Sequence, residues 1–271
     1  MPGKAETAQL NTAGLRSAFL QTDLFVPGEL HLTYTDLDRA IVGGACPTTS
    51  ALDLPAGEQL KAEFFCQRRE IGVINLGAAG SIVVDGSEHQ LNKLDCLYIG
   101  RGSRKVTFKS ATASEPAAFY IVSYPAHADY PTKLATPAQN NQLKLGSKTD
   151  ANERTINQVI HENGIKSCQL VLGFTELAPG SIWNTMPSHT HDRRSEVYCY
   201  FDIPAGHAVL HMMGEPAETR PLWVNNHHVV LSPSWSIHSG VGTNAYRFVW
   251  AMGGENQRFD DMDKILIPDL R

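Results

Sequence analysis

A long series of short runs rich in β-branched and aromatic residues most constrains the fold of this chain. Such runs recur from residue 30 to residue 125, for example Ile-Gly-Val-Ile-Asn-Leu at 71–76 and Ala-Phe-Tyr-Ile-Val at 118–122. Glycine, proline or Asp-Gly turns separate many of them, and Asp85-Gly86 is a strong hairpin signal. Many short strands at regular spacing predict a β-sandwich or a β-barrel.

A polar stretch rich in proline and amide residues interrupts this pattern at about residues 125–150, and strand-like runs resume after it. We therefore expect two β domains, at residues 1–130 and 151–271, joined by a connecting segment at 131–150. The length of 271 residues is sufficient for both. Residues 12–22 have the apolar spacing of a short amphipathic helix, with Thr12 as its possible cap.

Three residues near the middle of the second half have the spacing of metal ligands. His189 and His191 are two residues apart, so on an extended chain their imidazoles point to the same face. Glu196 is an odd number of residues further on, and we expect the polar run 192–195 to form a turn that returns the chain beside the first strand. Its carboxylate then faces the same interior.

A fourth ligand is expected at His238, which follows the apolar run 229–231 and a proline-containing turn. Three imidazoles and one carboxylate suit a divalent transition metal, but they do not by themselves distinguish zinc from iron, manganese or nickel. The other eight histidines of the chain form no second ligand set and are interpreted as structural.

Composition excludes several other classes of protein. The net charge is -5 and no basic run is present, so we expect no nucleic-acid partner and no anionic-membrane partner. The five cysteines are odd in number, scattered and without a Cys-x-x-Cys pair, which favours reduced thiols over a disulfide framework. No stretch has the apolar length of a signal peptide core or a membrane span, so a cytoplasmic protein is expected.

A short sequence similarity between the two halves suggests an internal duplication. Arg68-Arg69-Glu70 precedes an apolar run, as Arg193-Arg194-Ser195-Glu196 does in the second half. When the paired arginines are superposed, Phe64 and Cys66 take the places of the two spaced histidines. The first copy is therefore expected to lack a metal site.

His-x-His, four residues, Glu and a later His together resemble the metal motif of the cupin superfamily. Longer segments are similar to the 5-dehydro-4-deoxy-D-glucuronate isomerase family, also known as 5-keto-4-deoxyuronate isomerases. These segments are Trp-Asn-Thr-Met-Pro at 183–187, His-Thr-His-Asp-Arg-Arg at 189–194, His-Met-Met-Gly at 211–214, Ser-Pro-Ser-Trp-Ser-Ile-His-Ser-Gly-Val-Gly-Thr at 232–243, Gly-Glu-Asn-Gln at 254–257 and Phe-Asp-Asp-Met-Asp at 259–263. Matches also occur at 41–44, 72–75 and 130–133, so the resemblance runs nearly end to end.

The resemblance implies an all-β bicupin with two jelly-roll β-barrel domains and a short N-terminal helix, assembled as a homohexamer. It implies one Zn²⁺ per subunit, held by His189, His191, Glu196 and His238 in the C-terminal barrel. The implied reaction is the aldose-ketose isomerisation of 5-dehydro-4-deoxy-D-glucuronate to 3-deoxy-D-glycero-2,5-hexodiulosonate in pectin degradation. A cupin dioxygenase that uses iron and a non-catalytic sugar-binding cupin are the alternatives.

The catalytic residues are not identified by the motif. A base must carry a proton between neighbouring carbons, and Glu176 or a metal-bound hydroxide are candidates. The substrate carboxylate calls for an arginine, for which Arg154, Arg193, Arg194 and Arg247 are candidates. The residues that flank the ligand segments, namely Trp183, Thr185, Met186 and Trp235, are candidates to line the pocket.

Overall fold

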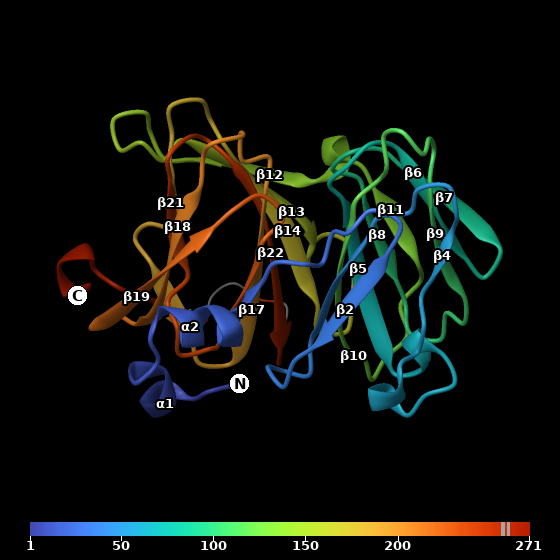
Figure 1. Cartoon of the computed structure of the whole chain (residues 1–271), viewed down its shortest axis with the longest axis horizontal. Coiled ribbons are helices and arrows are strands. Elements are labelled where there is room, and N and C mark those ends of the chain that lie inside the picture. Colours follow the sequence, from blue (N-terminus) through green and yellow to red (C-terminus); the bar gives the residue numbers. More distant parts are fainter. Residues whose placement is uncertain (256–257, 259–260) are drawn as a thin grey trace. The chain divides into compact units, whose positions relative to one another are not determined.

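Strands are the main regular elements of the computed structural model, which describes residues 1–255, 258 and 261–271. Asn256, Gln257, Phe259 and Asp260 belong to two of the segments that resemble the isomerase family, and they lie outside the described residues. The strands pair into five antiparallel or mixed sheets that are distributed over two units (Figure 1). The all-β prediction is confirmed.

The two units are not consecutive in sequence. One, here called the C-terminal unit, contains Met1–Thr22, Gln142–Gln158 and Gly173–Arg271, and the other, the N-terminal unit, contains Asp23–Asn141 and Val159–Leu172. This division differs from the expected domains at 1–130 and 151–271. The N-terminal residues join the C-terminal unit because β1 (Leu20–Gln21) pairs with β20 (Val229–Ser232). Residues 159–172 join the N-terminal unit, where the buried carboxylate of Glu70 accepts hydrogen bonds from the amides of residues 168–170.

The N-terminal unit is a two-sheet sandwich. Its six-stranded sheet has the order β11-β8-β5-β10-β3-β2, and its four-stranded sheet has the order β4-β9-β6-β7. The bounds of the strands are β2 Leu30–Tyr34, β3 Ile41–Ala45, β4 Leu52–Asp53, β5 Arg69–Asn75, β6 Gly80–Val84, β7 Ser87–Leu91, β8 Cys96–Ile99, β9 Val106–Ser110, β10 Phe119–Pro125 and β11 Lys133–Ala135. Two 3₁₀ turns, η1 (Glu58–Leu60) and η2 (Phe65–Gln67), precede β5.

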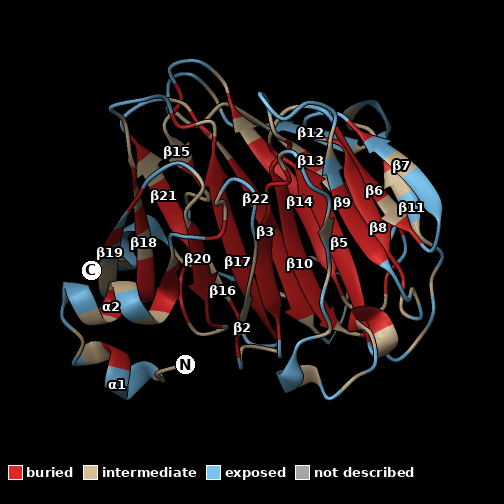
Figure 2. Cartoon of the chain, turned by 45° about the vertical axis from the view of Figure 1, so that its right-hand side comes forward, coloured by how far each residue is buried: buried red, intermediate tan, exposed pale blue. Residues whose placement is uncertain are grey.

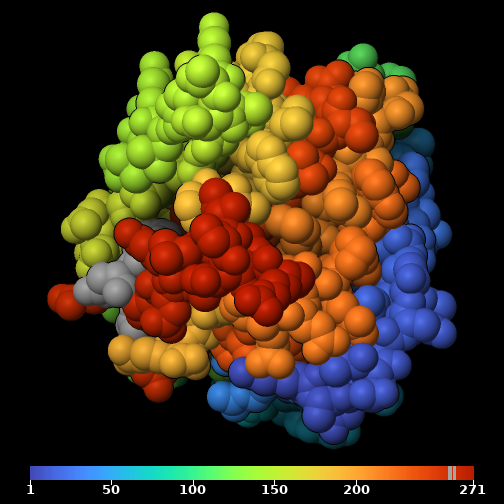
Figure 3. Space-filling view, turned by 90° about the vertical axis from the view of Figure 1, so that its left-hand side faces the viewer, coloured from blue at the N-terminus to red at the C-terminus, as the bar shows by residue number. Residues whose placement is uncertain are grey.

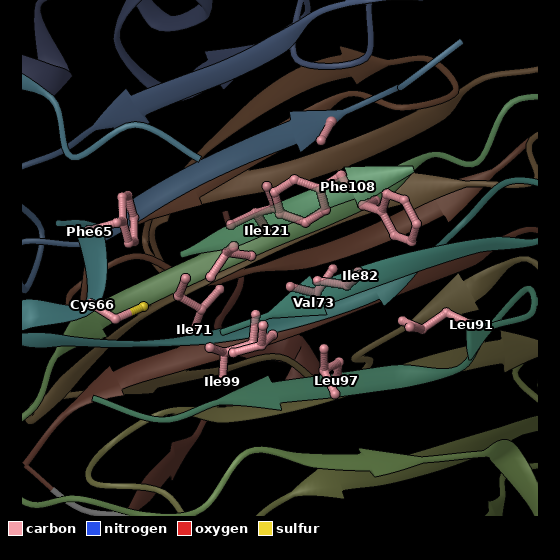
Figure 4. Packing of buried hydrophobic residues seen from close by; sticks show 14 of the residues in the cluster. Phe65, Cys66, Ile71, Val73, Ile82, Leu91, Leu97, Ile99, Phe108 and Ile121 are labelled. Atoms are coloured by element: carbon pink, nitrogen blue, oxygen red, sulfur yellow. The ribbon is translucent and has the colours of Figure 1, made fainter. Parts of the chain in front are cut away.

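Alternate residues of both sheets fill the interior of this unit, as the period of two in a strand requires. Ile71 and Val73 of β5 pack in one cluster with Ile82 of β6 and Phe108 of β9 (Figure 4). The predicted Asp85-Gly86 turn joins β6 to β7, and both residues have positive φ, as a two-residue hairpin turn demands. The interior is therefore occupied by apolar side chains.

The C-terminal unit contains the other three sheets, apart from the end of β13 and the start of β14, which fall within Val159–Leu172. Their orders are β1-β20-β17-β22-β14-β13-β12, β15-β21-β18-β19 and β16-β23. The bounds not yet given are β12 Asn141–Leu145, β13 Arg154–Ile160, β14 Val171–Leu177, β15 Trp183–Asn184, β16 His189–His191, β17 Arg194–Phe201, β18 Val209–Glu215, β19 Glu218–Val224, β21 Ser239–Gly242, β22 Arg247–Gly254 and β23 Met262–Lys264. The central strand β17 is buried along its whole length (Figure 2).

The expected N-terminal helix is present as α2 (Thr12–Phe19), and a second short helix, α1 (Lys4–Ala8), precedes it. Asn11 rather than Thr12 caps α2, because the Asn11 side chain accepts a hydrogen bond from the amide of Gly14. The segment 131–150 is not a plain connection. It contains β11, the 3₁₀ turn η3 (Pro137–Gln139) and β12. The sequence analysis missed the two strands because they are short, largely polar and at the edges of their sheets.

The two units share a three-strand arrangement that supports the internal duplication. In the N-terminal unit β5 lies between β8 and β10, and Ile71 pairs with Ile99 and Ser123. In the C-terminal unit β17 lies between β20 and β22, and Glu196 pairs in the same way with Ser232 and Met252. The superposition of the arginine pairs also places Ile71 on Glu196. A buried isoleucine thus occupies the position of the carboxylate in the first copy.

Candidate metal centre

Three separate pieces of the C-terminal unit supply the four predicted ligands. His189 and His191 are the first and last residues of β16, Glu196 is on β17, and His238 directly precedes β21. The proline-containing turn predicted before His238 is present and follows β20. The predicted hairpin between the histidines and the glutamate is wrong, because β16 pairs with β23 and β17 pairs with β20 and β22. A bend at residues 192–193 nevertheless redirects the chain, and Glu196 faces the histidines.

The side chains of these four residues converge. Nε2 of His238 lies 2.9 Å from Oε2 of Glu196 and 3.0 Å from Nε2 of His189. Nε2 of His191 lies 3.1 Å from the same glutamate oxygen. One donor atom from each of the four residues falls within 4.8 Å of the others, so the group could hold a metal ion. Donor atoms around tetrahedral zinc with bonds of ~2.0–2.1 Å lie about 3.4 Å apart, close to these separations.

The electrostatics of the group keep two of the four donors, His189 and Glu196, in the forms that bind a metal. Burial, followed by the proximity of His238, lowers the pKa of His189 to about 2, so this imidazole is neutral at pH 7. Burial by itself raises the pKa of the Glu196 carboxyl, but His238 and His191 outweigh it and hold that pKa well below its ordinary value. A neutral imidazole and an ionised carboxylate release no proton when a metal binds.

Further contacts lie behind two of the ligands. Nδ1 of His238 lies 3.3 Å from the carbonyl oxygen of Ser236 and 3.5 Å from the hydroxyl of Ser232. Nδ1 of His191 lies 3.4 Å from Nε of Arg194 and 4.0 Å from Oδ1 of Asp261. Arg194 and Asp261 form a buried ion pair at 2.5 Å. Polar groups therefore lie beside the Nδ1 atom of each ring, on the side away from the other ligands.

A cavity of about 630 Å³ opens beside the four residues. Its wall is largely apolar, and it includes Ile156, Phe248, Trp250 and Met252 from the seven-stranded sheet. Three of the four candidate ligands, His189, His191 and Glu196, line it directly. The charged groups at its wall besides these are Arg154 and Lys264. A small polar molecule could thus reach the donor atoms while its other side contacts apolar surface.

The C-terminal tail covers one face of this unit, where Figure 3 shows it in red between β12, in yellow-green, and the N-terminal helices, in blue. The amide of Ile265 donates a hydrogen bond to the carbonyl of Ser188, next to the first ligand. Thr219 and Pro216 hold the last residue, Arg271, through backbone hydrogen bonds. The tail therefore positions β23 beside the ligand strand β16.

The structure separates the four arginine candidates. Arg154 lines the cavity, and its guanidinium donates a hydrogen bond to the carbonyl of Asn152 at 2.9 Å. No carboxylate pairs with it among the described residues. Arg193 is exposed and pairs with Glu255, whereas Arg194 lies buried behind His191.

All but one of the remaining candidates lie outside the described wall of the cavity. Arg247 pairs with Glu176 at 2.7 Å, so a cation engages the carboxylate that was suggested as a base. Neither residue is in the described wall of the cavity. Of the flanking residues Thr185 lines the cavity, and its hydroxyl lies 2.9 Å from that of Tyr198. Trp235 lines a small separate cavity near α1, and Trp183 and Met186 are absent from the described wall of the large one.

The match to a family model covers residues 24–266, and the description of that model is the KduI/IolB family. A relative from Opitutus terrae named 4-deoxy-L-threo-5-hexosulose-uronate ketol-isomerase is 54% identical over 271 residues, which are 100% of this chain and 98% of that protein. A relative of the same name from Escherichia coli is 49% identical over 98% of this chain and 97% of its own. The chain belongs to the KduI/IolB family.

Solved structures show the fold of this family member. An IolB-like protein from Salmonella typhimurium is 15% identical, with a TM-score of 0.72 over 91% of this chain and 96% of that chain. Oxalate decarboxylase from Bacillus subtilis is 8% identical, with a TM-score of 0.58 over 90% of this chain and 76% of that chain. These likenesses support the predicted bicupin fold. The family match over residues 24–266 and the relatives confirm the resemblance to the family. Among the described residues, the helices are all too short or too polar to cross a lipid bilayer.

Sequence reasoning missed two titratable residues in the described wall of this family member's cavity. Lys264 is opposite His189 in the β16–β23 pair, so both side chains project from the same face, and it lines the cavity. No strand signal marks β23, which is three residues long. Tyr198 also lines the cavity, and burial, reinforced by Glu196, raises its pKa well above the ordinary value, so its hydroxyl stays protonated. Because Tyr198 is two residues after Glu196 on a strand, its side chain points to the same face, and the sequence could have indicated it for this reason.

Proposed function

We propose that this protein is an aldose-ketose isomerase that converts 5-dehydro-4-deoxy-D-glucuronate to 3-deoxy-D-glycero-2,5-hexodiulosonate during uronate breakdown from pectin. The observation that carries the proposal is the convergence of three imidazoles and one carboxylate at a cavity that also holds Arg154 and Lys264. The relatives named as uronate ketol-isomerases, at about half identity over nearly the whole chain, support the same reaction. The proposed homohexamer is a further inference from the family resemblance.

Zn²⁺ is the proposed ion, with one bound per subunit by His189, His191, Glu196 and His238. A set of three neutral nitrogen donors and one carboxylate oxygen fits zinc, and the short separations of the donors favour a small ion. When bound, the ion would supply Lewis-acid stabilisation of the negative charge that develops on the substrate oxygens, which is typically worth several kcal/mol. Because Glu196 is assigned to the metal, it is a poor choice as the base.

Arg154 is the proposed partner of the substrate carboxylate. It is the arginine of the four candidates that lines the cavity, and burial lowers its pKa from the ordinary value. A buried guanidinium without a carboxylate gains most from an anionic ligand, which it can hold through two parallel hydrogen bonds. The largely apolar lining of the cavity would strengthen such an ion pair.

Lys264 is the proposed proton carrier. The titratable residues at the described wall are Arg154, His189, His191, Glu196, Tyr198 and Lys264. Three of these are assigned to the metal, the arginine stays charged, and the Tyr198 hydroxyl stays protonated. Lys264 would accept the proton from the carbon that bears the hydroxyl and return it to the neighbouring carbon. Its place opposite His189 keeps it close to the metal ligands.

The decisive experiment is a proton NMR time course with enzymatically prepared 5-dehydro-4-deoxy-D-glucuronate. The protein is tested as purified, after chelation, and after zinc is restored. We expect conversion that stops on chelation and returns with zinc. If none of the three samples converts the substrate, the isomerase assignment fails, and oxygen uptake with added iron then tests the dioxygenase alternative.

A further inference from the structure

A second cavity, of about 490 Å³, lies in the N-terminal unit, within the copy in which Phe64, Cys66 and Ile71 replace metal ligands. It is here called the arginine cavity. Four arginines line it, namely Arg39, Arg68, Arg69 and Arg101, together with Tyr34, His127 and Gln169. No acidic residue occurs in its described wall. The proposed isomerase reaction makes no use of this cavity.

Arg69 is the least expected of the four, because it is 6% exposed at the start of β5. Its guanidinium donates hydrogen bonds to the hydroxyl and the carbonyl of Ser123 and to the carbonyl of Arg39, all of which are neutral acceptors. Burial lowers its pKa to about 10, and the charge of Arg39 acts in the same direction. A buried cation without a carboxylate is costly unless another anion compensates it.

The internal duplication provides a direct comparison for this residue. Arg194 begins β17 as Arg69 begins β5, and both are buried. In the second copy Asp261 neutralises the arginine at 2.5 Å. In the first copy, no described residue places a carboxylate against Arg69. In the second copy a carboxylate thus compensates the charge of the buried arginine. In the first copy the equivalent arginine lines a cavity instead.

The other three arginines are more exposed than Arg69. Arg68 is anchored by hydrogen bonds to the carbonyls of Leu60 and Lys61, which fixes its direction. Arg101 pairs with Asp129, whose side chain is 71% exposed and is outside the described wall. A paired exposed carboxylate neutralises little of the field of four guanidiniums. The wall therefore carries a strong positive charge and several planar donors.

We propose that the arginine cavity binds a small organic polyanion with carboxylate or phosphate groups, at a site separate from the metal centre. Each oxyanion group can accept paired hydrogen bonds from a guanidinium, and the cavity volume fits a molecule the size of a sugar acid or a tricarboxylate. Phe65 and Leu60 give the cavity an apolar side against which the carbon skeleton packs. The ligand supplies the negative charge that Asp261 supplies to Arg194.

Isothermal titration calorimetry of the protein as purified tests this, with citrate and inorganic pyrophosphate as separate probes at constant ionic strength in chloride. We expect binding of at least one probe, weakened about tenfold or more by Arg39→Gln, since hydrogen bonds to charged groups are worth about 1.5–3 kcal/mol. Arg39 is exposed, so the variant should fold normally. Arg104→Gln is the matched control, because Arg104 is an exposed arginine of the same unit outside the cavity.

The titration outcomes separate the possible sources of binding. Binding of citrate alone identifies carboxylates as the ligand class, and binding of pyrophosphate alone identifies phosphates. Absence of binding by both probes overturns the proposal, as does equal weakening by Arg39→Gln and Arg104→Gln. Loss of binding in His189→Ala would assign the anion to the metal centre and overturn it as well. These outcomes are independent of whether the protein isomerises a uronate.

Discussion

Asp261 lies behind the candidate metal centre, with its Oδ1 atom 2.5 Å from Nη2 of Arg194 and 4.0 Å from Nδ1 of His191. Nε of Arg194 donates a hydrogen bond to Nδ1 of His191 at 3.4 Å. Binding of a metal by Nε2 of His191 would put the ring proton on Nδ1, and Asp261 is the carboxylate that lies beside that atom. Carboxylates in this position fix the orientation of a ligand imidazole and raise its basicity. Arg194 in turn holds the carboxylate in place.

Asp261→Asn is therefore expected to weaken zinc binding by about 10- to 100-fold without unfolding the protein. The amide keeps the shape of the side chain but loses its charge. Competition with a fluorescent zinc chelator measures the affinity. Glu255→Gln is the control, because Glu255 pairs with Arg193 on the surface of the same unit. Equal zinc affinity in the wild type and Asp261→Asn would show that this carboxylate does not support the centre.

Removal of a ligand should abolish both metal content and activity. His238→Ala deletes a ring whose Nε2 contacts both Glu196 and His189, so we expect a protein without stoichiometric zinc and a loss of kcat/KM of at least about 1,000-fold. His207→Ala is the matched control, since His207 bonds to Thr243 and is absent from the described cavity wall. Metal analysis measures the zinc content of both variants, and initial rates measure their kcat/KM. A His238→Ala protein that keeps both zinc and activity would contradict the ligand assignment.

Chelation should also lower the melting temperature of the wild type, because an ion that binds only the folded state stabilises it by mass action. The expected difference is about 4 kcal/mol when free zinc exceeds its Kd by about 1,000-fold. Differential scanning calorimetry measures this in the wild type and in His238→Ala. The variant should not respond to chelation.

Acid should destabilise the metal-free protein through a buried histidine outside the ligand set. Burial lowers the pKa of His211 to about 3, and its Nδ1 atom lies 2.7 Å from the Tyr200 hydroxyl. Between about pH 6.5 and pH 3 the unfolded chain binds a proton that the folded chain does not, so the free energy of unfolding falls as the pH falls. The limiting slope is about 1.4 kcal/mol per pH unit for each such group.

Urea unfolding of the chelated protein from pH 7 to pH 4 measures this slope. His211→Gln should be less stable at pH 7, since the Tyr200 hydrogen bond changes, but its stability should depend less on pH. His31→Gln, which alters a partly exposed histidine paired with Glu29, is the control. An unchanged slope in His211→Gln would mean that other groups dominate the acid response.

The sequence predicted which four side chains converge better than it predicted the path that brings them together. His189 and His191 share a face because of the strand period, and this holds in β16. The expected hairpin failed because the partner of β16 is β23, which lies more than seventy residues away and has no local signal. Long-range pairing of so short a strand depends on the tail that positions it, and sequence patterns do not report such contacts.

The cavity wall shows the same limit. Arg154, Arg193 and Arg194 have the same chemistry, and only the fold shows that the first lines the cavity while Glu255 and Asp261 neutralise the others. Lys264 has no motif of its own, because its relevance comes from its cross-strand pairing with His189. Residue type predicts which chemistry is available, and tertiary contacts determine which copy of a residue type can perform it.

Replacement of the proposed proton carrier should affect chemistry and leave metal binding intact. Lys264→Met is expected to lower kcat by about 10²- to 10⁴-fold and to abolish incorporation of solvent deuterium into the product, with zinc content unchanged. Lys144→Met is the control, since Lys144 is on β12 between two residues that line the cavity and is itself absent from the described wall. NMR in D₂O reports both quantities. Full deuterium incorporation by Lys264→Met would assign the proton transfer to another group.

Replacement of the proposed carboxylate partner should act mainly on substrate binding. Arg154→Gln removes the cavity's guanidinium, and since hydrogen bonds to charged groups are worth about 1.5–3 kcal/mol, KM should rise by about 10- to 100-fold with a smaller change in kcat. Arg193→Gln is the control, because this exposed arginine is next to the ligand turn but pairs with Glu255. Steady-state kinetics of both variants compare the two candidates directly. A rise in KM in Arg193→Gln and not in Arg154→Gln would move the carboxylate site from the cavity wall to the turn.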